Sequence, residues 1–181
     1  MIGEVVSLTP VPAVLPGGII GEIDPTKYGE QNIWVVLFFY PADFTWVCPT
    51  ELLDLHDHYE DFCAMNTEVW CISTDSVYVH QNWRGQDLGT DFSLPLVSDS
   101  NWVLSEDFNC LDRGAGMSYR CTVIVDPNST IRYYSIQDNA VGRNADELIR
   151  TLAAYQACDA SEGCVACAGW EIGDPLTTPG A

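Results

Sequence analysis

A continuous apolar and aromatic run at residues 33–40 is the feature that most constrains this chain. Its length fits a β-strand that is covered on both faces, as in the sheet of an α/β protein. The run ends at Pro41, and a short loop leads to Cys48 and Pro49. Because proline suits the first turn of a helix, an amphipathic helix is expected to begin here. We therefore expect a buried strand that delivers a cysteine to the start of a helix.

The position of Cys48 favours a reactive thiolate. The first N–H groups of a helix have no partners within the helix, and the positive end of the helix dipole lies there. Both effects stabilise a negatively charged sulfur, which is the nucleophilic form of cysteine. Thr45, three residues earlier, can place a hydroxyl near this sulfur. The alternative interpretation is a buried structural cysteine beside a turn.

Strand and helix patterns alternate through the remaining chain. The segment 1–20 is rich in Pro, Gly and Val, which favours an irregular arm with a short strand or two. After Cys48, apolar residues recur at helical spacing, which predicts a helix that faces the core with Leu52, Leu55, Tyr59 and Phe62. The other expected elements are strands at 68–74, 94–97, 120–126 and 131–136, helices from Ser76, at 102–108 and after Asn144, and a glycine-bearing loop at 111–118. Periodicity alone predicts an α/β fold with a mixed sheet.

One domain is expected, because the sequence contains no internal repeat and no second core pattern. We assign it to residues 1–158. Residues 159–181 hold small residues, turn signals and Gly/Pro, which is typical of an extended tail outside the core.

Acidic residues dominate the charge of the chain. Lys and Arg total 7 against 26 Asp and Glu, a formal net charge of −19. Such a surface repels phosphate backbones, so nucleic-acid binding is not expected. The acids are spread along the chain, which is typical of halophile proteins, in which salt screens the self-repulsion. An acidic protein without salt adaptation is the alternative interpretation.

Eight cysteines in 181 residues are too sparse for a disulfide scaffold. In a reducing cytoplasm they are expected to be mostly thiols. Cys71 and Cys121 lie inside apolar runs and are expected to be small core residues. The sequence shows no basic region followed by an apolar stretch at its start and no apolar run of membrane length, so the expected location is the cytoplasm.

Residues 35–52 read V-V-L-F-F-Y-P-A-D-F-T-W-V-C-P-T-E-L. Pro41, Thr45 and Cys48 match the P-x-x-x-T-x-x-C signature of the peroxiredoxins, and the surrounding residues are close to the alkyl hydroperoxide reductase C, or typical two-cysteine, branch. The chain resembles this family from about residue 35 to residue 156. The resemblance implies a thioredoxin-like fold, with a central mixed sheet flanked by helices, and a thiol-dependent peroxidase.

The resemblance also implies roles for two central residues. Cys48 would be the peroxidatic cysteine, which attacks the peroxide and becomes a sulfenic acid. Arg120, in Y-R-C-T-V-I-V-D, matches an arginine that lies against this sulfur in the family. The residues alone point the same way, because Arg120 begins an otherwise apolar strand, where a charged group is rare without a partner. A surface ion pair at a strand edge is the alternative.

Four further residues match the family pattern around this centre. Thr45 would offer its hydroxyl to the peroxide oxygens, and Pro41 would shield the site. Glu51, in P-T-E-L, matches a glutamate that orients this arginine in the family. Arg143, in V-G-R-N, also matches a family position near the active site.

The tail departs from the family. In the typical two-cysteine branch a resolving cysteine lies in a V-C-P-A-x-W motif of the partner subunit's tail, whereas this chain reads G-C-V-A-C-A-G-W. Aligned without a gap on Gly163 and Trp170, the family's cysteine falls on Ala166. We take Cys167 as the first candidate for the resolving cysteine and Cys164 as the second. Their C-x-x-C spacing suits a redox pair or half of a metal site.

A peroxidase of this kind implies a hydroperoxide substrate, namely hydrogen peroxide or a small organic hydroperoxide. It also implies a thioredoxin-like or flavoprotein disulfide reductase as electron donor, and a homodimer that can assemble into a ring of dimers. No cofactor and no metal are expected, because His56 and His58 lie two positions apart and face different sides of a helix, and the chain holds a single C-x-x-C.

Two other functions remain open. A thioredoxin-type thiol–disulfide oxidoreductase predicts C-x-x-C at the start of the first helix, where this chain instead has Thr45 before Cys48 and Glu51 after it. A non-catalytic, chaperone-like assembly on the same fold is the third interpretation.

Overall fold

The computed structural model describes residues 1–180, apart from the side chain of Lys27. The strands are β1 Val11–Leu15, β2 Ile19–Ile23, β3 Trp34–Phe39, β4 Thr67–Ser73, β5 Leu96–Ser98, β6 Leu111–Asp112, β7 Met117–Ser118, β8 Arg120–Val125 and β9 Ile131–Gln137. The α-helices are α1 Cys48–Asp57, α2 Tyr59–Ala64, α3 Val77–Trp83, α4 Val103–Asp107 and α5 Ala145–Ala160. A π-helical turn, Arg84–Leu88, extends α3, and short 3-10 turns lie at Pro16–Gly18 and Pro25–Lys27.

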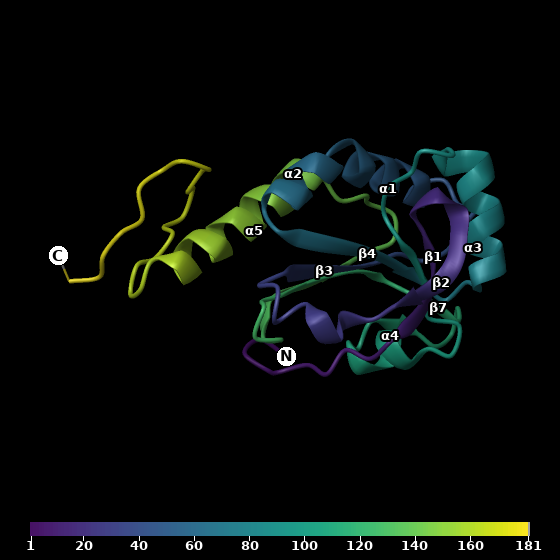
Figure 1. Cartoon of the computed structure of the whole chain (residues 1–181), viewed down its shortest axis with the longest axis horizontal. Helices are drawn as coiled ribbons and strands as arrows, with labels where there is room; N and C mark the ends of the chain where they lie inside the picture. Colours follow the sequence, from purple (N-terminus) through teal and green to yellow (C-terminus); the bar gives the residue numbers. More distant parts are fainter. Residues whose placement is uncertain (181) are drawn as a thin grey trace. The chain divides into compact units, whose positions relative to one another are not determined.

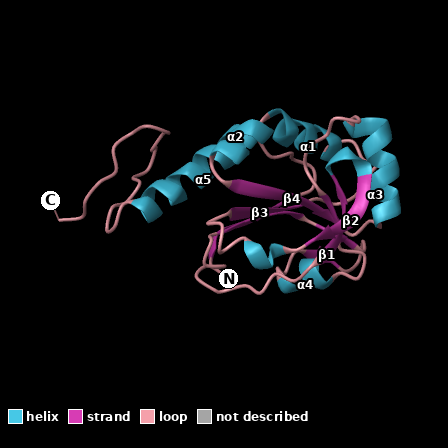
Figure 2. Ribbon diagram, in the orientation of Figure 1, coloured by secondary structure: helices cyan, strands magenta, loops and turns pink. Residues whose placement is uncertain are grey.

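Seven of these strands form one mixed sheet in the order β2-β1-β5-β4-β3-β8-β9 (Figure 2). The strands β3, β4 and β5 run parallel, whereas β1, β2, β8 and β9 each pair antiparallel with their neighbours. The helices α1 and α2 cover one face of the sheet, and α4 lies on the opposite face (Figure 1). The predicted α/β fold with a central mixed sheet is confirmed.

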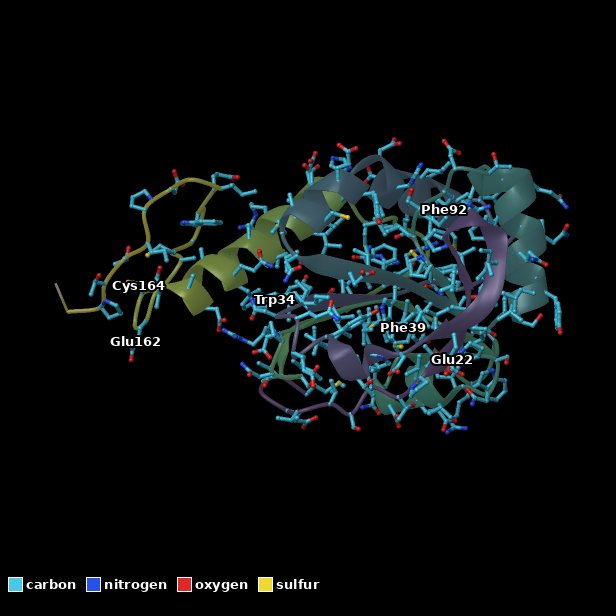
Figure 3. All side chains as sticks on the ribbon, in the orientation of Figure 1. Glu22, Trp34, Phe39, Phe92, Glu162 and Cys164 are labelled. Atoms are coloured by element: carbon cyan, nitrogen blue, oxygen red, sulfur yellow. The ribbon has the colours of Figure 1, made fainter. Side chains whose placement is uncertain are left out.

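The strand β3 lies in the middle of the sheet, and all six of its residues are buried. Val35, Leu37 and Phe39 alternate along it and belong to the core cluster that also contains Leu104 and Phe108 from the α4 region. Figure 3 labels Phe39 among the side chains of this core. The residues between them face the other side of the sheet, since side chains alternate along a strand. Burial on both faces explains why the sequence reads as an unbroken apolar run.

The chain forms two compact units, Met1–Arg143 and Asn144–Ala181. The second unit contains α5, which begins where the Asn144 side chain accepts a hydrogen bond from the Glu147 N–H, 3.0 Å away. The predicted boundary between a domain and a tail at residue 159 stays a prediction. None of the helices that the structure describes is long and apolar enough to span a membrane.

The N-terminal segment is more ordered than its composition indicates. The predicted short strands are present, but they belong to the main sheet, in which β1 lies between β2 and β5. Ala13 and Val14 are fully buried. The sequence does not indicate this, because Pro12, Pro16 and the nearby glycines are typical of loops. The segment forms a strand because it pairs with β5, which lies far away in sequence.

The predicted helix after Cys48 is interrupted. It ends at Asp57, and α2 begins at Tyr59, because His58 has φ −100° and ψ 14°, which is not helical. Leu52, Leu55 and Phe62 are buried as predicted, but the prediction for Tyr59 is wrong, since 37% of it is exposed. The break changes the direction in which the second helix presents its side chains.

We expect molar salt to stabilise the fold. Three of the seven basic residues, Arg84, Arg120 and Arg143, have buried side chains, which leaves few cations to offset the surface carboxylates. Raising potassium chloride from low to molar concentration should raise the thermal unfolding midpoint by roughly 5 °C, the shift that about 2 kcal/mol produces in a domain of this size. Chloride is preferred to sulfate, which strengthens apolar burial in any protein. A midpoint that does not rise would count against a salt adaptation.

Candidate active site

The strand β3 and the helix α1 place Cys48 inside the protein. Pro41 follows the strand and is buried, and the loop after it returns to the first residue of α1, which is Cys48 itself. Pro49 occupies the first turn of the helix, as the sequence predicts. The Cys48 side chain is fully buried. Its sulfur therefore lies at the helix N-terminus, where backbone N–H groups and the helix dipole favour negative charge.

Arg120 reaches this sulfur from the neighbouring strand. It is the first residue of β8, which runs antiparallel to β3 with Phe38 opposite Thr122. That register brings Arg120 to the carboxyl end of β3, from which the loop to Cys48 departs. The Nη1 atom of Arg120 lies 3.4 Å from the Cys48 Sγ atom, and only 3% of Arg120 is exposed. A buried guanidinium at this distance stabilises a thiolate.

Glu51 lies one turn along α1 and binds two arginines. Its Oε2 atom accepts a hydrogen bond from Arg120 Nη1 at 2.5 Å, and its Oε1 atom accepts one from Arg143 Nε at 2.9 Å. All three side chains are buried. A buried carboxylate is stable only when it is paired and hydrogen-bonded, and Glu51 meets this condition on both oxygens. It therefore fixes the orientation of Arg120 as well as its charge.

Two further contacts hold Arg120 in place. The carbonyl oxygen of Asn139 accepts hydrogen bonds from Arg120 Nε at 3.1 Å and Nη2 at 2.8 Å. The Asn139 side chain also accepts the Arg120 backbone N–H at 3.2 Å. Because Asn139 engages Nε and Nη2 while Glu51 binds Nη1, the Nη1 group is held against the sulfur. No pattern in the sequence indicated Asn139, which lies in the loop after β9.

Arg143 belongs to the same cluster. Its Nη2 atom donates to the Phe39 carbonyl at 2.9 Å, and its guanidinium lies 3.3 Å from the centre of the Phe38 ring. Burial lowers the pKa of Arg143, and Glu51 opposes this effect. The family pattern indicated Arg143 near the active site. The structure places it against Glu51, which in turn binds the arginine that contacts the sulfur.

Thr45 lies on the loop between Pro41 and Cys48 and is exposed. Its hydroxyl donates to the Ala42 carbonyl at 2.8 Å. The proton of this hydroxyl is therefore engaged, while the lone pairs of the oxygen can still accept a hydrogen bond.

Trp46, on the same loop, is 94% exposed, and Phe44 adopts a left-handed φ of 55°. Such strain in a non-glycine residue persists only where the surrounding contacts enforce it.

A buried cluster around Asp43, the residue before Phe44, holds this loop to the body of the protein, and sequence reasoning missed it. The Asp43 carboxylate accepts a hydrogen bond from the Tyr40 hydroxyl at 2.8 Å and lies 2.8 Å from Nδ1 of His80. Its backbone N–H donates to the Asp75 side chain at 2.9 Å. Burial raises the pKa of Asp43, and His80 opposes this. An acid four residues after the end of β3 was the available signal, but its partner His80 is 37 residues away in sequence.

The remaining cysteines of the first unit differ from Cys48. Cys71 and Cys121 are buried core residues, as predicted, and Cys110 is buried as well. Burial raises the pKa of Cys71, and a hydrogen bond with Cys121, together with burial, raises the pKa of Cys110. A raised pKa favours the protonated form of both thiols, which is the less reactive form. Cys63 is exposed on α2.

The two candidate resolving cysteines lie in the segment after α5, in the second unit. Figure 3 labels Cys164 there. Cys167 is exposed, and its Sγ atom donates to the Thr177 hydroxyl at 3.2 Å. Cys164 is half-buried, and its Sγ atom lies 3.6 Å from the Thr178 hydroxyl. All eight cysteines of the chain are free thiols.

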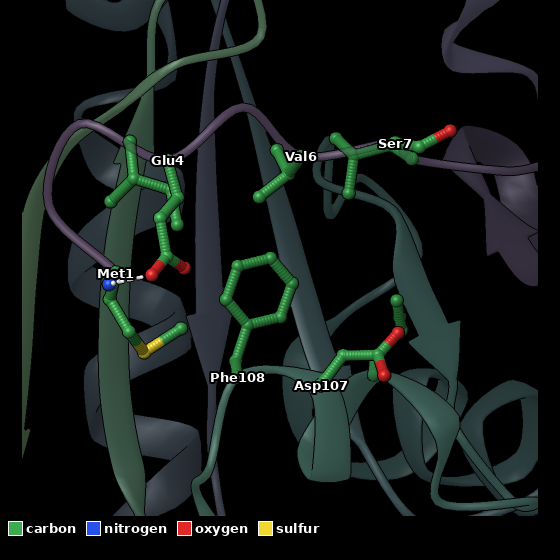
Figure 4. Close-up of a pocket in the computed structure, with 9 residues that line it drawn as sticks. Met1, Glu4, Val6, Ser7, Asp107 and Phe108 are labelled. Atoms are coloured by element: carbon green, nitrogen blue, oxygen red, sulfur yellow. Dashed lines mark ion pairs between the residues drawn. The ribbon is translucent and has the colours of Figure 1, made fainter.

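A hollow elsewhere in the first unit is not part of this site. It lies between the N-terminal segment and α4, and Met1, Glu4 and Phe108 line it (Figure 4). The Met1 amino group forms an ion pair with Glu4 at 2.7 Å at its edge. None of the predicted site residues lines this hollow.

A cysteine at a helix N-terminus, held against a buried arginine at one edge of a mixed α/β sheet, defines a thiol-based redox enzyme. The model of the AhpC/TSA family matches residues 11–134 of this chain. Peroxiredoxin prdx-2 of Caenorhabditis elegans is 41% identical over 163 residues, which cover 87% of this chain and 80% of that protein. Alkyl hydroperoxide reductase C of Salmonella typhimurium is 34% identical over 158 residues, covering 87% and 84%.

Solved structures of peroxiredoxins and of AhpC are also similar to this chain. The reduced 2-Cys peroxiredoxin of Plasmodium vivax matches with a TM-score of 0.90 and 31% identity, covering 97% of this chain and 91% of that one. Enterococcus faecalis AhpC matches with a TM-score of 0.82 and 37% identity, covering 92% and 98%. The chain belongs to the AhpC/TSA family. It is a thiol-dependent peroxidase with the thioredoxin-like fold that the sequence predicts.

Proposed function

We propose that Cys48 reduces hydrogen peroxide and small organic hydroperoxides. The observation that supports this most directly is the 3.4 Å contact between Arg120 Nη1 and the sulfur at the start of α1. The Cys48 thiolate attacks one peroxide oxygen, a sulfur–oxygen bond forms, and the oxygen–oxygen bond breaks. The other oxygen leaves as hydroxide or alkoxide and takes a proton from water. Cys48 is left as a sulfenic acid.

The surrounding residues would assist at defined points. Arg120 stabilises the thiolate and then the charge that develops on the departing oxygen, which is a large contribution in a buried site. Glu51 positions Arg120 and does not contact the peroxide. Thr45 accepts a hydrogen bond from the peroxide through its lone pairs, and Pro41 keeps water from the sulfur. Fixing the peroxide in line with the sulfur lowers the entropy cost of the attack.

In the second step a tail cysteine would resolve the sulfenic acid. Its thiolate attacks the Cys48 sulfur, a disulfide forms, and hydroxide leaves and becomes water. Cys167 is the first candidate because its sulfur is exposed, and Cys164 is the second. The ungapped family position is Ala166, so resolution requires a shift of one residue in the tail register for Cys167.

The partners follow from this chemistry. A thioredoxin-like protein or a flavoprotein disulfide reductase would reduce the disulfide, and a reducing compartment such as the cytoplasm suits a chain whose cysteines are all thiols. A homodimer, with a ring of dimers as a further assembly, would bring a partner's tail to Cys48. The outermost position of β9 in the sheet supports pairing between subunits, because an edge strand is a template for another chain.

Peptide mapping by mass spectrometry tests the proposal. After one equivalent of hydrogen peroxide without reductant, Cys48 should be the first cysteine to change, either as a sulfenic acid trapped by dimedone or within a disulfide. Cys71 and Cys110 should stay unmodified. An unmodified Cys48 beside oxidised cysteines elsewhere would overturn the proposal.

Replacing both Cys164 and Cys167 with serine should separate the two steps. The first oxidation should keep its rate, because Cys48, Arg120 and Glu51 are all unchanged, while disulfide formation should stop. Stopped-flow oxidation of Cys48 measures the first step, and turnover with a thioredoxin-type reductant measures the second. Turnover that persists with the double variant would show that the tail is not needed for resolution.

A further inference from the structure

The tail hairpin, which we define as residues 161–178, holds two thiols where resolution needs one. Val165 lies between Cys164 and Cys167 and forms an antiparallel bridge with Thr177, with both backbone hydrogen bonds at 2.9 Å. Val165 is therefore the point at which the C-x-x-C segment is held to the returning chain. Figure 3 marks Cys164 on this loop beyond the end of α5.

Both sulfurs contact the same short stretch of the returning chain. The Cys167 sulfur binds the Thr177 hydroxyl, and the Cys164 sulfur lies beside the hydroxyl of the adjacent Thr178. Each contact is a single weak hydrogen bond at the surface, so either sulfur can leave it at little cost. The two thiols are thus held to adjacent residues of the returning chain, and neither is locked in a core.

The backbone around the pair permits the rearrangement that a disulfide needs. Gly163 and Gly169 flank the two cysteines and have φ values of +73° and +77°. No atom lies within 4 Å of the position that a Cβ would take at either glycine. Beyond the second glycine, the buried Trp170 donates its indole N–H to the Asp174 carbonyl at 3.1 Å, and Arg150 of α5 donates to the Trp170 carbonyl. The C-x-x-C segment therefore has an uncrowded glycine on each side of it, and the chain beyond the second glycine is anchored through Trp170.

From this geometry, and resting on the proposed function, we propose that the tail C-x-x-C is a second redox centre that accepts the disulfide from Cys48. Cys167 first condenses with the Cys48 sulfenic acid. The Cys164 thiolate then attacks the Cys167 sulfur, so that the Cys164–Cys167 bond forms and the Cys48–Cys167 bond breaks. Cys48 leaves as a thiolate, and no further oxidant or reductant is consumed. The reductase then acts on the exposed tail disulfide.

Two physical arguments give this exchange its direction. Cys164 is covalently linked to Cys167 through two residues, so its effective concentration at the mixed disulfide is that of a very short tether, and it competes well with an external thiol. Exchange also favours expulsion of the sulfur that better carries negative charge. Cys48 is that sulfur, because it returns to the start of α1 and to Arg120.

The test counts the peroxide that the full-length protein consumes without reductant. With the relay, one equivalent leaves a Cys164–Cys167 disulfide and a free Cys48. A second equivalent then converts Cys48 to a sulfenic acid, which has no resolving thiol left and reacts with dimedone. The wild type should thus consume two equivalents per subunit at the rate of Cys48 oxidation. Cys164→Ser should consume one, end as a Cys48–Cys167 disulfide, and show no dimedone adduct.

Cys63→Ser is the matched control, since it removes another exposed thiol outside the tail and should behave as the wild type does. Cys164→Ala repeats the measurement in case the serine hydroxyl alters the hairpin. A wild type that stops after one equivalent with Cys48–Cys167 as its disulfide overturns the relay and leaves the proposed function intact. An unmodified Cys48 overturns both.

Discussion

Replacing Cys48 with serine should reduce peroxidase activity by at least about 10⁴-fold, the scale seen when an enzyme loses its nucleophile. Serine has nearly the same shape, but a hydroxyl at neutral pH does not supply the anionic nucleophile that the attack needs. The other buried thiols cannot substitute, because Cys71 and Cys110 have raised pKa values and lie in the core. The initial rate of peroxide consumption with dithiothreitol as reductant measures this loss.

Cys63→Ser serves as the control for this variant, because Cys63 is exposed and lies outside the Arg120 cluster. It should keep wild-type activity. Cys48→Ser should keep the wild-type unfolding midpoint to within a few degrees, which separates a chemical effect from loss of the fold. Residual activity above a tenth of wild type in the folded variant would move the nucleophile to another residue.

The sequence predicted the elements on which this chemistry depends because they are local. An apolar run, a proline and a cysteine within 17 residues are enough to place a thiol at the start of α1. The strand that begins at Arg120 was also predicted from its apolar residues. Arg120 itself stood out because a cation at the start of an apolar strand is rare without a partner. The family signature then indicated which partner, and the structure places Arg120 against Cys48.

The network behind these residues could not be derived from spacing, because it joins distant parts of the chain. Asp43 meets His80 across 37 positions, and Glu51 meets Arg143 across 92. Each contact depends on the sheet order, in which β8 pairs with β3 although four other strands separate them in sequence. Likewise β1 looked like part of an irregular arm until its pairing with β5 was known.

The tail shows a different kind of gap between sequence and structure. Sequence alignment left Cys164 and Cys167 as competing candidates for one role. The hairpin shows both thiols held beside Thr177 and Thr178, which gives each of them a place in one exchange reaction. The departure from the family motif then changes which cysteines hold the disulfide after Cys48 has been oxidised. The number of peroxide equivalents consumed per subunit tests this.

Arg120→Ala should slow the reaction of Cys48 with hydrogen peroxide by about 10²–10³-fold, the usual cost of losing one charged donor from a buried site. The variant removes the cation that lies 3.4 Å from the sulfur. It does not leave a buried carboxylate alone, because Glu51 keeps its hydrogen bonds to Arg143. The fold should therefore persist, and the loss should appear in the rate constant for oxidation rather than in the unfolding midpoint.

Two further arginine variants make this result specific. Arg120→Lys keeps a positive charge, but a single ammonium group cannot serve Cys48, Glu51 and Asn139 together as the guanidinium does, so an intermediate rate is expected. Arg132→Ala, which removes a guanidinium paired with Asp126 on the β9 side of the sheet, should leave the rate unchanged. The fluorescence of Trp46, two residues before Cys48, offers a signal for stopped-flow measurement. Near-normal oxidation in Arg120→Ala would mean that the helix N-terminus alone activates the thiol, and Arg120 would then serve only to pair with Glu51.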